Sequence, residues 1–158
     1  MRPADAPAIL DVYNHYVRHS SATFDIEPFS LTSRRSWFEL FVNDVYRCFV
    51  ATDDGRLLGY AACTPFREKP AYRPSVEVSV YVAPDHLNRG VGSALYDTLL
   101  PTIANSVLHR AYACITLPNV ASIALHEKHG FHRVGHHSEA GFKFDRYWDI
   151  AWYEKALD

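Results

Sequence analysis

The segment VEVSVYVAPDHLNRGVGSALYDTLLP, residues 76–101, gives the clearest indication of the fold of this chain. It begins with alternating valines, typical of a strand, and passes through two closely spaced glycines into an apolar repeat typical of a helix. Amides at a helix N-terminus carry partial positive charge and have no helical partner, so they attract anions. Gly90 and Gly92 let this backbone approach a diphosphate without an intervening Cβ, and Arg89 adds a cation. A plain tight turn is the alternative that two glycines alone leave open.

Two familiar phosphate-binding motifs do not match this loop. A dinucleotide-binding fold has a third glycine where Leu95 stands, and an acidic residue near the end of the next strand, which RAYACITL (residues 110–117) does not offer. A P-loop needs Gly-Lys followed by Ser or Thr, and the sequence has no Gly-Lys pair. If the loop holds a phosphate group, that group belongs to another class of ligand.

Size and composition predict one soluble globular domain over residues 1–158. The 16 Lys and Arg nearly balance the 18 Asp and Glu, and no basic block stands out, so nucleic acid is not an expected partner. No run is long and apolar enough to span a membrane, and the start lacks the basic and apolar regions of a signal peptide. Three cysteines without C-x-x-C spacing predict buried, reduced thiols in a cytoplasmic protein: Cys48, Cys63 and Cys114.

Hydrophobic periodicity predicts a sheet with helices on its faces. Strands are expected at residues 46–52, 57–64, 75–82, 110–117, 131–137 and 143–155. Helices are expected at residues 5–18, 31–42, 92–105 and 119–129. In the second helix, Thr32 is a candidate N-cap, with three apolar residues as buried anchors: Trp37, Leu40 and Phe41. This mixture predicts an α/β (α+β) fold.

The glycine loop with its preceding strand, V-Y-V-x-P-D-H-x-x-R-G-V-G-S-A-L, resembles the acetyl-CoA site of GNAT-superfamily N-acetyltransferases. Six blocks along the chain resemble, in order, the phosphinothricin and methionine sulfoximine acetyltransferases: DAPAILDVYN, SATFDIEP, LLGYAACTPFREKPAYR, SVEVSVYV, NVASIALHEKHGF and AGFKFDRYWD. The resemblance implies a single mixed, mostly antiparallel sheet flanked by helices. It also implies a homodimer with the substrate cleft near the interface.

The resemblance implies how acetyl-CoA would be held. The strand edge at Val80, Tyr81 and Val82 would pair with the pantetheine arm. The loop amides would grip the pyrophosphate, through Asn88, Arg89, Gly90, Val91, Gly92 and Ser93. On the following helix, two polar residues that share one face would touch pantetheine: Asn119 and Ser122. Asn119 is also a candidate N-cap of this helix, and both roles can hold.

Two residues are candidate acid–base groups. Glu77 shares a strand face with Ser79 and Tyr81, and desolvation in an apolar strand would raise the pKa of its carboxyl toward that of a useful base, acting directly or through a water. A glutamate on the wet face of a sheet is the structural alternative. His126 is spaced by four from Ser122 on its helix and is a candidate acid or second base, with a surface helix as the alternative.

The acceptor would be a small amino acid with an anionic or polar end. Arg67 can bind a carboxylate or phosphinate through two parallel hydrogen bonds. The other residues expected to line the acceptor pocket are Phe24, Phe66, Glu68, Lys69, Tyr72, Glu77, Val78, Ser79, Phe142 and Lys143.

Two departures from the family pattern stand out. Leu87 replaces the Arg or Gln that usually opens the phosphate loop, which predicts weaker CoA binding, with Arg89 as a possible substitute. Almost nothing precedes Arg2-Pro3, so the first strand is expected to be short or missing, or the true start to lie upstream. Nine histidines raise the question of a metal, but no spacing among them matches a metal site, and none is expected.

The sequence leaves the acceptor open. A GNAT enzyme for another amine, such as a peptide N-terminus or a polyamine, is the nearest alternative. A non-catalytic acyl-CoA sensor is the alternative from another functional class.

Overall fold

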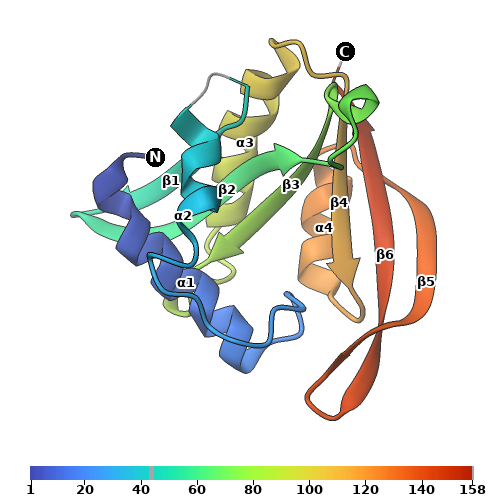
Figure 1. Cartoon of the computed structure of the whole chain (residues 1–158), viewed down its shortest axis with the longest axis horizontal. Coiled ribbons are helices and arrows are strands. Elements are labelled where there is room, and N and C mark those ends of the chain that lie inside the picture. Colours follow the sequence, from blue (N-terminus) through green and yellow to red (C-terminus); the bar gives the residue numbers. More distant parts are fainter. Residues whose placement is uncertain (43–44, 158) are drawn as a thin grey trace.

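The computed structural model describes residues 1–42 and 45–157 of the chain (Figure 1). The helices are α1 Ala6–His19, α2 Arg35–Glu39, α3 Val91–Ala104 and α4 Val120–Lys128. Short 3-10 turns are η1 Pro3–Asp5, η2 Leu40–Val42, η3 Pro70–Tyr72 and η4 Pro84–His86. The strands are β1 Cys48–Asp53, β2 Arg56–Pro65, β3 Ser75–Val82, β4 Arg110–Thr116, β5 His132–Lys143 and β6 Arg146–Ala156.

The strands form one mixed sheet in the order β1-β2-β3-β4-β6-β5. Every neighbouring pair is antiparallel except the central pair, β3 and β4, which run parallel. The β3–β4 pairing covers only Ser75–Glu77 against Arg110–Tyr112. Beyond it the two strands diverge, as Figure 1 shows. The sheet therefore has a V-shaped opening at its centre.

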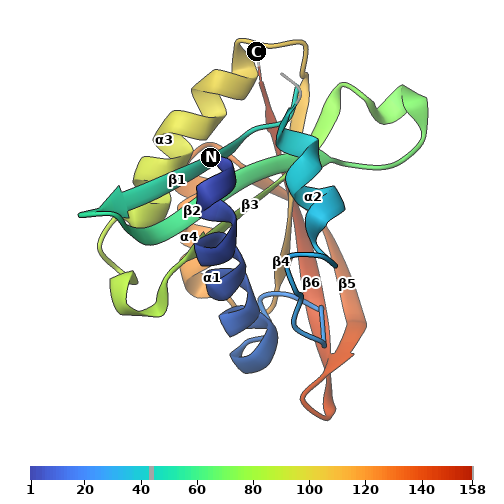
Figure 2. The same cartoon turned by 60° about the vertical axis from the view of Figure 1, so that its left-hand side comes forward.

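The helices cover both faces of the sheet because side chains alternate along each strand. Ala61 and Cys63 of β2 pack with α3 residues in one core, while Tyr60 and Ala62 pack with α1 in the other. Figure 2 shows α1 and α3 on opposite sides of β1 and β2. Every helix in the described residues is too short or too polar to cross a membrane.

The strand–loop–helix unit around the two glycines is confirmed, as is the hairpin at Asp54-Gly55. Both turn residues have positive φ, 45° and 79°, which fits the type I′ turn that matches strand twist. Before Cys48 the described residues form no strand, and the ammonium of Met1 donates to the Cys48 carbonyl at 2.8 Å.

The helix expected at residues 31–42 is wrong in its first half. The α-helical part is only Arg35–Glu39, and Arg34, not Thr32, stands at its N-cap. Ser30 and Ser33 exchange backbone–side-chain hydrogen bonds at 2.9 and 3.1 Å. These local bonds stabilise a turn in place of the first helical turn. The expected anchors Trp37, Leu40 and Phe41 are only partly buried.

The last two strands also differ from the prediction. β5 continues through residues 138–142, although glycine, alanine and glutamate there have low strand propensity. It does so with an irregular register between His137 and Gly141, where Glu139 adopts φ 51°. Phe144 and Asp145, expected in a strand, form the hairpin turn with φ 55° and 56°. Pairing with β6 therefore overrides local propensity.

Candidate active site

The open edge of β3 faces the V-shaped gap in the sheet. The Ala83 amide donates to Leu58 of β2 at 2.8 Å, so alternation directs the backbone groups of Val82 and Val80 away from β2. The Tyr16 hydroxyl of α1 donates to the Val82 carbonyl at 2.6 Å. An extended ligand in the gap could therefore bind the backbone groups of Val80, whereas the Val82 carbonyl already accepts from Tyr16.

The glycine loop lies at the end of that edge and opens α3. Gly90 is the N-cap residue of α3, with φ 78°. A Cβ there would touch nothing within 4 Å, so the backbone conformation, not space, requires glycine. Gly92 serves another purpose, because a Cβ there would lie 3.2 Å from Leu125 of α4. The loop amides and the close α3–α4 packing therefore depend on different glycines.

Helix α4 presents polar groups to the same opening. The Asn119 side-chain oxygen accepts from the Ser122 amide at 3.1 Å, which confirms Asn119 as the N-cap. Lys128 donates to the Ser93 hydroxyl at 2.7 Å and adds a cation beside the loop.

His126 is buried, with 3% of its surface exposed. Its Nδ1 lies 2.7 Å from the Ser122 carbonyl, and its Nε2 lies 2.8 Å from the Tyr96 hydroxyl. Because a carbonyl only accepts, Nδ1 carries the proton and Nε2 accepts from Tyr96. Desolvation lowers the pKa of His126, although the bond to Ser122 opposes it. The ring is therefore neutral, and both nitrogens are engaged within the chain.

Glu77 lies at the vertex of the gap, on the face opposite α3. Its side chain is 36% exposed and borders the central cavity. Desolvation raises the pKa of Glu77, and the Arg67 guanidinium, with Nη1 4.0 Å from Glu77 Oε2, partly opposes this. A carboxyl with a raised pKa beside an open cavity is suited to accept a proton near neutral pH.

A cavity of about 1020 Å³ joins these elements. It brings together most of the predicted site residues: Phe24, Glu77, Val78, Ser79, Val80, Tyr81, Val82, Asn88, Gly90, Val91, Gly92, Ser93, Asn119, Ser122 and His126. Leu87 also borders it, whereas Arg89, the possible substitute for the missing phosphate ligand, does not.

The remaining predicted acceptor residues lie elsewhere. A separate cavity of about 600 Å³ is bordered by Phe66, Arg67, Glu68, Lys69 and Tyr72. Arg67 stacks over the Phe66 ring at 4.1 Å and reaches toward Glu77, so it stands between the two cavities. Phe142 is exposed and Lys143 is buried, and neither borders a cavity described here.

Several cavity residues were missed by the sequence reasoning. Thr64 pairs directly with Glu77 in the sheet, and Cys114 and Thr116 lie on β4 where β3 has turned away. Cys114 is exposed, so the prediction of three buried thiols is wrong for it. It pairs with Trp152 of β6 on one side, but β3 no longer lies beside it on the other. Alternation along β4 from Tyr112, the partner of Glu77, would have found Cys114 and Thr116.

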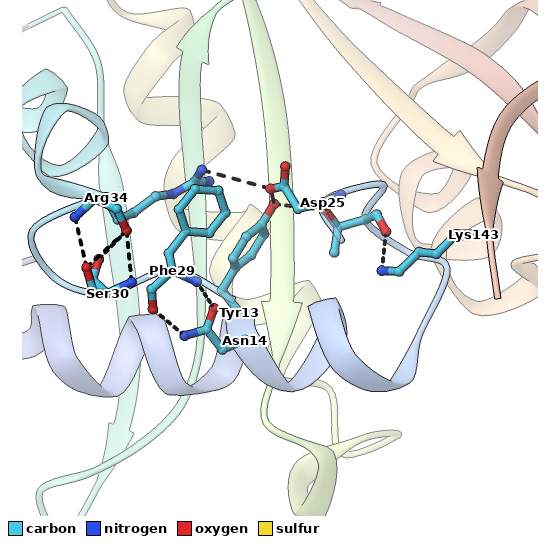
Figure 3. Close-up of polar contacts among 9 residues, drawn as sticks. Tyr13, Asn14, Asp25, Phe29, Ser30, Arg34 and Lys143 are labelled. Atoms are coloured by element: carbon cyan, nitrogen blue, oxygen red, sulfur yellow. Dashed lines mark hydrogen bonds and ion pairs between the residues drawn. The ribbon is translucent and has the colours of Figure 1, made fainter. Parts of the chain in front are cut away.

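A network of polar contacts between α1 and the segment that follows it also borders the cavity (Figure 3). No sequence motif indicated it. The Tyr13 hydroxyl donates to Asp25, and Arg34 lies 3.9 Å from the same carboxylate. Arg34 also lies over the rings of Tyr13 and Phe29, at 4.7 and 4.5 Å. Burial is the main cause that raises the pKa of Tyr13 to about 12, so its hydroxyl stays protonated. This network holds residues 23–34 against α1.

The comparisons with known proteins agree with this geometry. The model of the acetyltransferase (GNAT) family matches residues 9–131. A phosphinothricin N-acetyltransferase of Streptomyces coelicolor is 51% identical over 156 residues, which cover 97% of this chain and 91% of the relative. An L-methionine sulfoximine/L-methionine sulfone acetyltransferase of Pseudomonas aeruginosa is 36% identical, covering 98% and 91%.

A solved structure is also similar to this chain in its fold. It is the GNAT superfamily phosphinothricin acetyltransferase of Sinorhizobium meliloti in complex with acetyl-CoA, 32% identical, with a TM-score of 0.95 over 99% of this chain and 85% of that chain. The chain therefore belongs to the GNAT acetyltransferase family and is an acyltransferase enzyme.

Proposed function

We propose that this enzyme transfers the acetyl group of acetyl-CoA to the α-amine of a small amino acid or analogue of the phosphinothricin or methionine sulfoximine type. The observation that carries the proposal is the desolvated Glu77 carboxyl beside Arg67 on the border of a cavity of about 1020 Å³. The relatives named for these two acceptors, at 51% and 36% identity, support the substrate class.

Acetyl-CoA would lie along the β3 edge, with its pyrophosphate on the glycine loop. The amides that open α3 supply positive charge there without a metal ion. Among the described residues, no group of three or more His, Cys, Asp or Glu is arranged to hold a metal. Lys128 and the loop backbone are the nearest candidates to offset the leucine at position 87.

The reaction starts with a protonated amine, which must lose a proton before it attacks the thioester carbon. Glu77 takes that proton, directly or through a water. The nitrogen then bonds to the acetyl carbon, and the carbon–sulfur bond breaks as the electron pair leaves with the CoA sulfur. The attacking nitrogen loses its second proton as the amide forms, the thiolate takes up a proton in exchange through solvent, and N-acetyl amino acid and CoA are released.

His126 would serve this step in a different way from the one expected. Its Nε2 accepts from Tyr96 and its Nδ1 donates to Ser122, so it has no free proton of its own for the leaving thiolate. The only proton on the neutral ring is on Nδ1, and its transfer would break the bond to the Ser122 carbonyl. We therefore assign base catalysis to Glu77 first and keep His126 as a secondary proton carrier.

Arg67 would bind the acceptor carboxylate, since it stands 4.0 Å from Glu77 at the junction of the two cavities. That position places an α-amine near the base and its neighbouring carboxylate near the guanidinium. Phe24, Ser79 and Thr64 would form the walls around the side chain of the acceptor.

Mixing the protein with acetyl-CoA and an amine panel, and following CoA thiol release, tests the proposal. The panel holds phosphinothricin, methionine sulfoximine, common amino acids, a peptide and spermidine. Turnover of the first two is the expected result. Turnover of only the peptide or spermidine would show that the proposed acceptor class is wrong. Acetyl-CoA binding without turnover of any amine would indicate a sensor.

We further infer that residues 1–158 act as one domain, in the cytoplasm, as a homodimer. The long outer strand β5 is an unpaired sheet edge in the described chain, which supports pairing with a second copy. Light scattering coupled to size exclusion should give twice the 18.0 kDa chain mass. A monomer mass would contradict the dimer while leaving the chemistry unaffected.

A further inference from the structure

One wall of the central cavity is built by residues 20–24, the segment that follows α1. Phe24 is its largest side chain and is partly exposed toward the cavity. The segment has no regular secondary structure, so its position depends on contacts with other elements. Those contacts come from α1 on one side and from the β5–β6 hairpin on the other.

Lys143, the last residue of β5, binds the backbone carbonyls of this segment. Its Nζ donates to the carbonyls of Ser20 and Thr23, both at 2.8 Å, across more than 100 residues of sequence. Figure 3 shows Lys143 with one of these two bonds. The residue is buried, and desolvation lowers the pKa of its ammonium group. A lysine so placed is a cross-link between the hairpin and the cavity wall, and it does not border the cavity itself.

Gly141, two residues earlier on β5, leaves the space that the Phe24 ring occupies. A Cβ added at Gly141 would lie 2.2 Å from Phe24 Cε2 and 2.5 Å from its Cδ2. No atoms can share that space, so the ring occupies the volume that a side chain at position 141 would fill. Gly135 on the same strand differs, since a Cβ there would meet Trp152 at an ordinary 3.6 Å.

The hairpin tip is itself fixed, so it can act as a rigid support. Trp148 of β6 donates from its indole to the Lys143 carbonyl at 2.8 Å. Phe144 and Asp145 close the tip with a two-residue turn, both with positive φ. The tip therefore presents Gly141 and Lys143 to residues 20–24 in one arrangement.

We propose that the tip of the β5–β6 hairpin sets the acceptor specificity of the enzyme through Phe24, with Gly141 and Lys143 as positioning residues. This rests on the proposed function, in which Phe24 borders the acceptor. Gly141 admits the ring, and Lys143 fixes the backbone from which the ring projects. Neither residue lies in the region assigned to acetyl-CoA.

Two substitutions act on the two contacts separately. Lys143→Met keeps a long side chain but leaves the Ser20 and Thr23 carbonyls without their donor. In Gly141→Ala the added methyl group overlaps the Phe24 ring. The ring is then displaced, because a side chain moves more readily than the backbone. Each variant should raise the KM for the acceptor about tenfold, equivalent to about 1.4 kcal/mol, and leave the KM for acetyl-CoA within about twofold.

Matched controls lie on the same strand. Gly135→Ala adds the same methyl group without a clash, and Arg133→Met removes an exposed cation. Both controls should keep wild-type kinetics for both substrates. Lys143→Arg keeps a donor and should recover part of the acceptor KM. In a Phe24→Ala background, Gly141→Ala should have no further effect, because no ring remains to be displaced.

Hydrogen exchange gives a readout that does not need turnover. Lys143→Met should speed amide exchange in residues 20–26 and leave residues 57–63 of β2 unchanged. If the wild type turns over no amine on the panel, the proposed function fails, while the exchange result still tests the cross-link. Unchanged exchange in residues 20–26, equal rises in both KM values, or an undiminished Gly141→Ala effect without Phe24 would each overturn the inference.

Discussion

Replacing Glu77 by Gln tests the chemistry with almost no change in shape. The amide keeps the volume of the side chain and its place 4.0 Å from Arg67, but it cannot accept the amine proton at neutral pH. A positioned general base contributes about 100- to 10,000-fold to a rate. We therefore expect kcat to fall by that factor, which corresponds to about 3–5 kcal/mol of barrier. The KM for acetyl-CoA should stay within about twofold.

The raised pKa of Glu77 predicts how stability and activity vary with pH. Because the folded pKa lies above the unfolded one, the protonated form favours folding, and this contribution is lost as pH rises through the folded pKa. Above that pH, Glu77→Gln should be at least as stable as the wild type. In the wild type, kcat/KM should rise as Glu77 loses its proton, and the variant should lack this rise.

The assay is CoA thiol release with phosphinothricin from pH 5 to 9, together with thermal unfolding at each pH. Glu27→Gln, an exposed glutamate away from the cavity, is the matched control and should behave as the wild type. A Glu77→Gln enzyme that keeps more than about a tenth of wild-type kcat would refute base catalysis by Glu77. Loss of activity together with a large loss of stability at pH 8 would refute the desolvation argument.

Three other substitutions test separate parts of the site. Gly90→Ala forces a methyl group onto a residue with φ 78°, which costs about 1–2 kcal/mol, and titration calorimetry should show weaker acetyl-CoA binding; unchanged affinity would count against the loop. Tyr96→Phe leaves His126 Nε2 without its donor, so unfolding free energy should fall by about 1–3 kcal/mol, and an unchanged value in denaturant titration would mean that the bond contributes nothing. Tyr16→Phe frees the Val82 carbonyl and should lower stability by about 1 kcal/mol, visible as a drop of about 2–4 °C in Tm; no drop would indicate that water replaces the hydroxyl.

Local patterns were enough to predict the strand, loop and helix that border the central cavity. The alternation in β3 and the glycines before α3 depend on neighbouring residues, so the strand at residues 75–82 and the helix after the glycines could be predicted from sequence alone. The N-cap role of Asn119 is equally local, because its acceptor bond is to Ser122, three residues ahead. In these places chain neighbours are also the contacts that matter.

Long-range contacts and competing local hydrogen bonds account for what the sequence did not reveal. Lys143 was expected beside the acceptor, but its ammonium group binds carbonyls more than 100 residues away and supports the cavity wall from behind. Cys114 was expected in the core, but β3 leaves β4 before reaching it. Residues 31–34 were expected in a helix, but the Ser30–Ser33 turn replaces it. Each error concerns a residue whose environment is set by a distant strand or by competing side-chain bonds.

Acetyl transfer to the α-amine of an acidic or polar amino acid analogue is the activity proposed for this enzyme. The most direct measurement incubates the protein with isotopically labelled acetyl-CoA and phosphinothricin, and locates the label in the product by NMR while CoA thiol is counted. The proposed function predicts labelled acetyl on the α-nitrogen, in equal amount to the thiol released. Label found only in free acetate, or only on a peptide or polyamine offered in parallel, would contradict it.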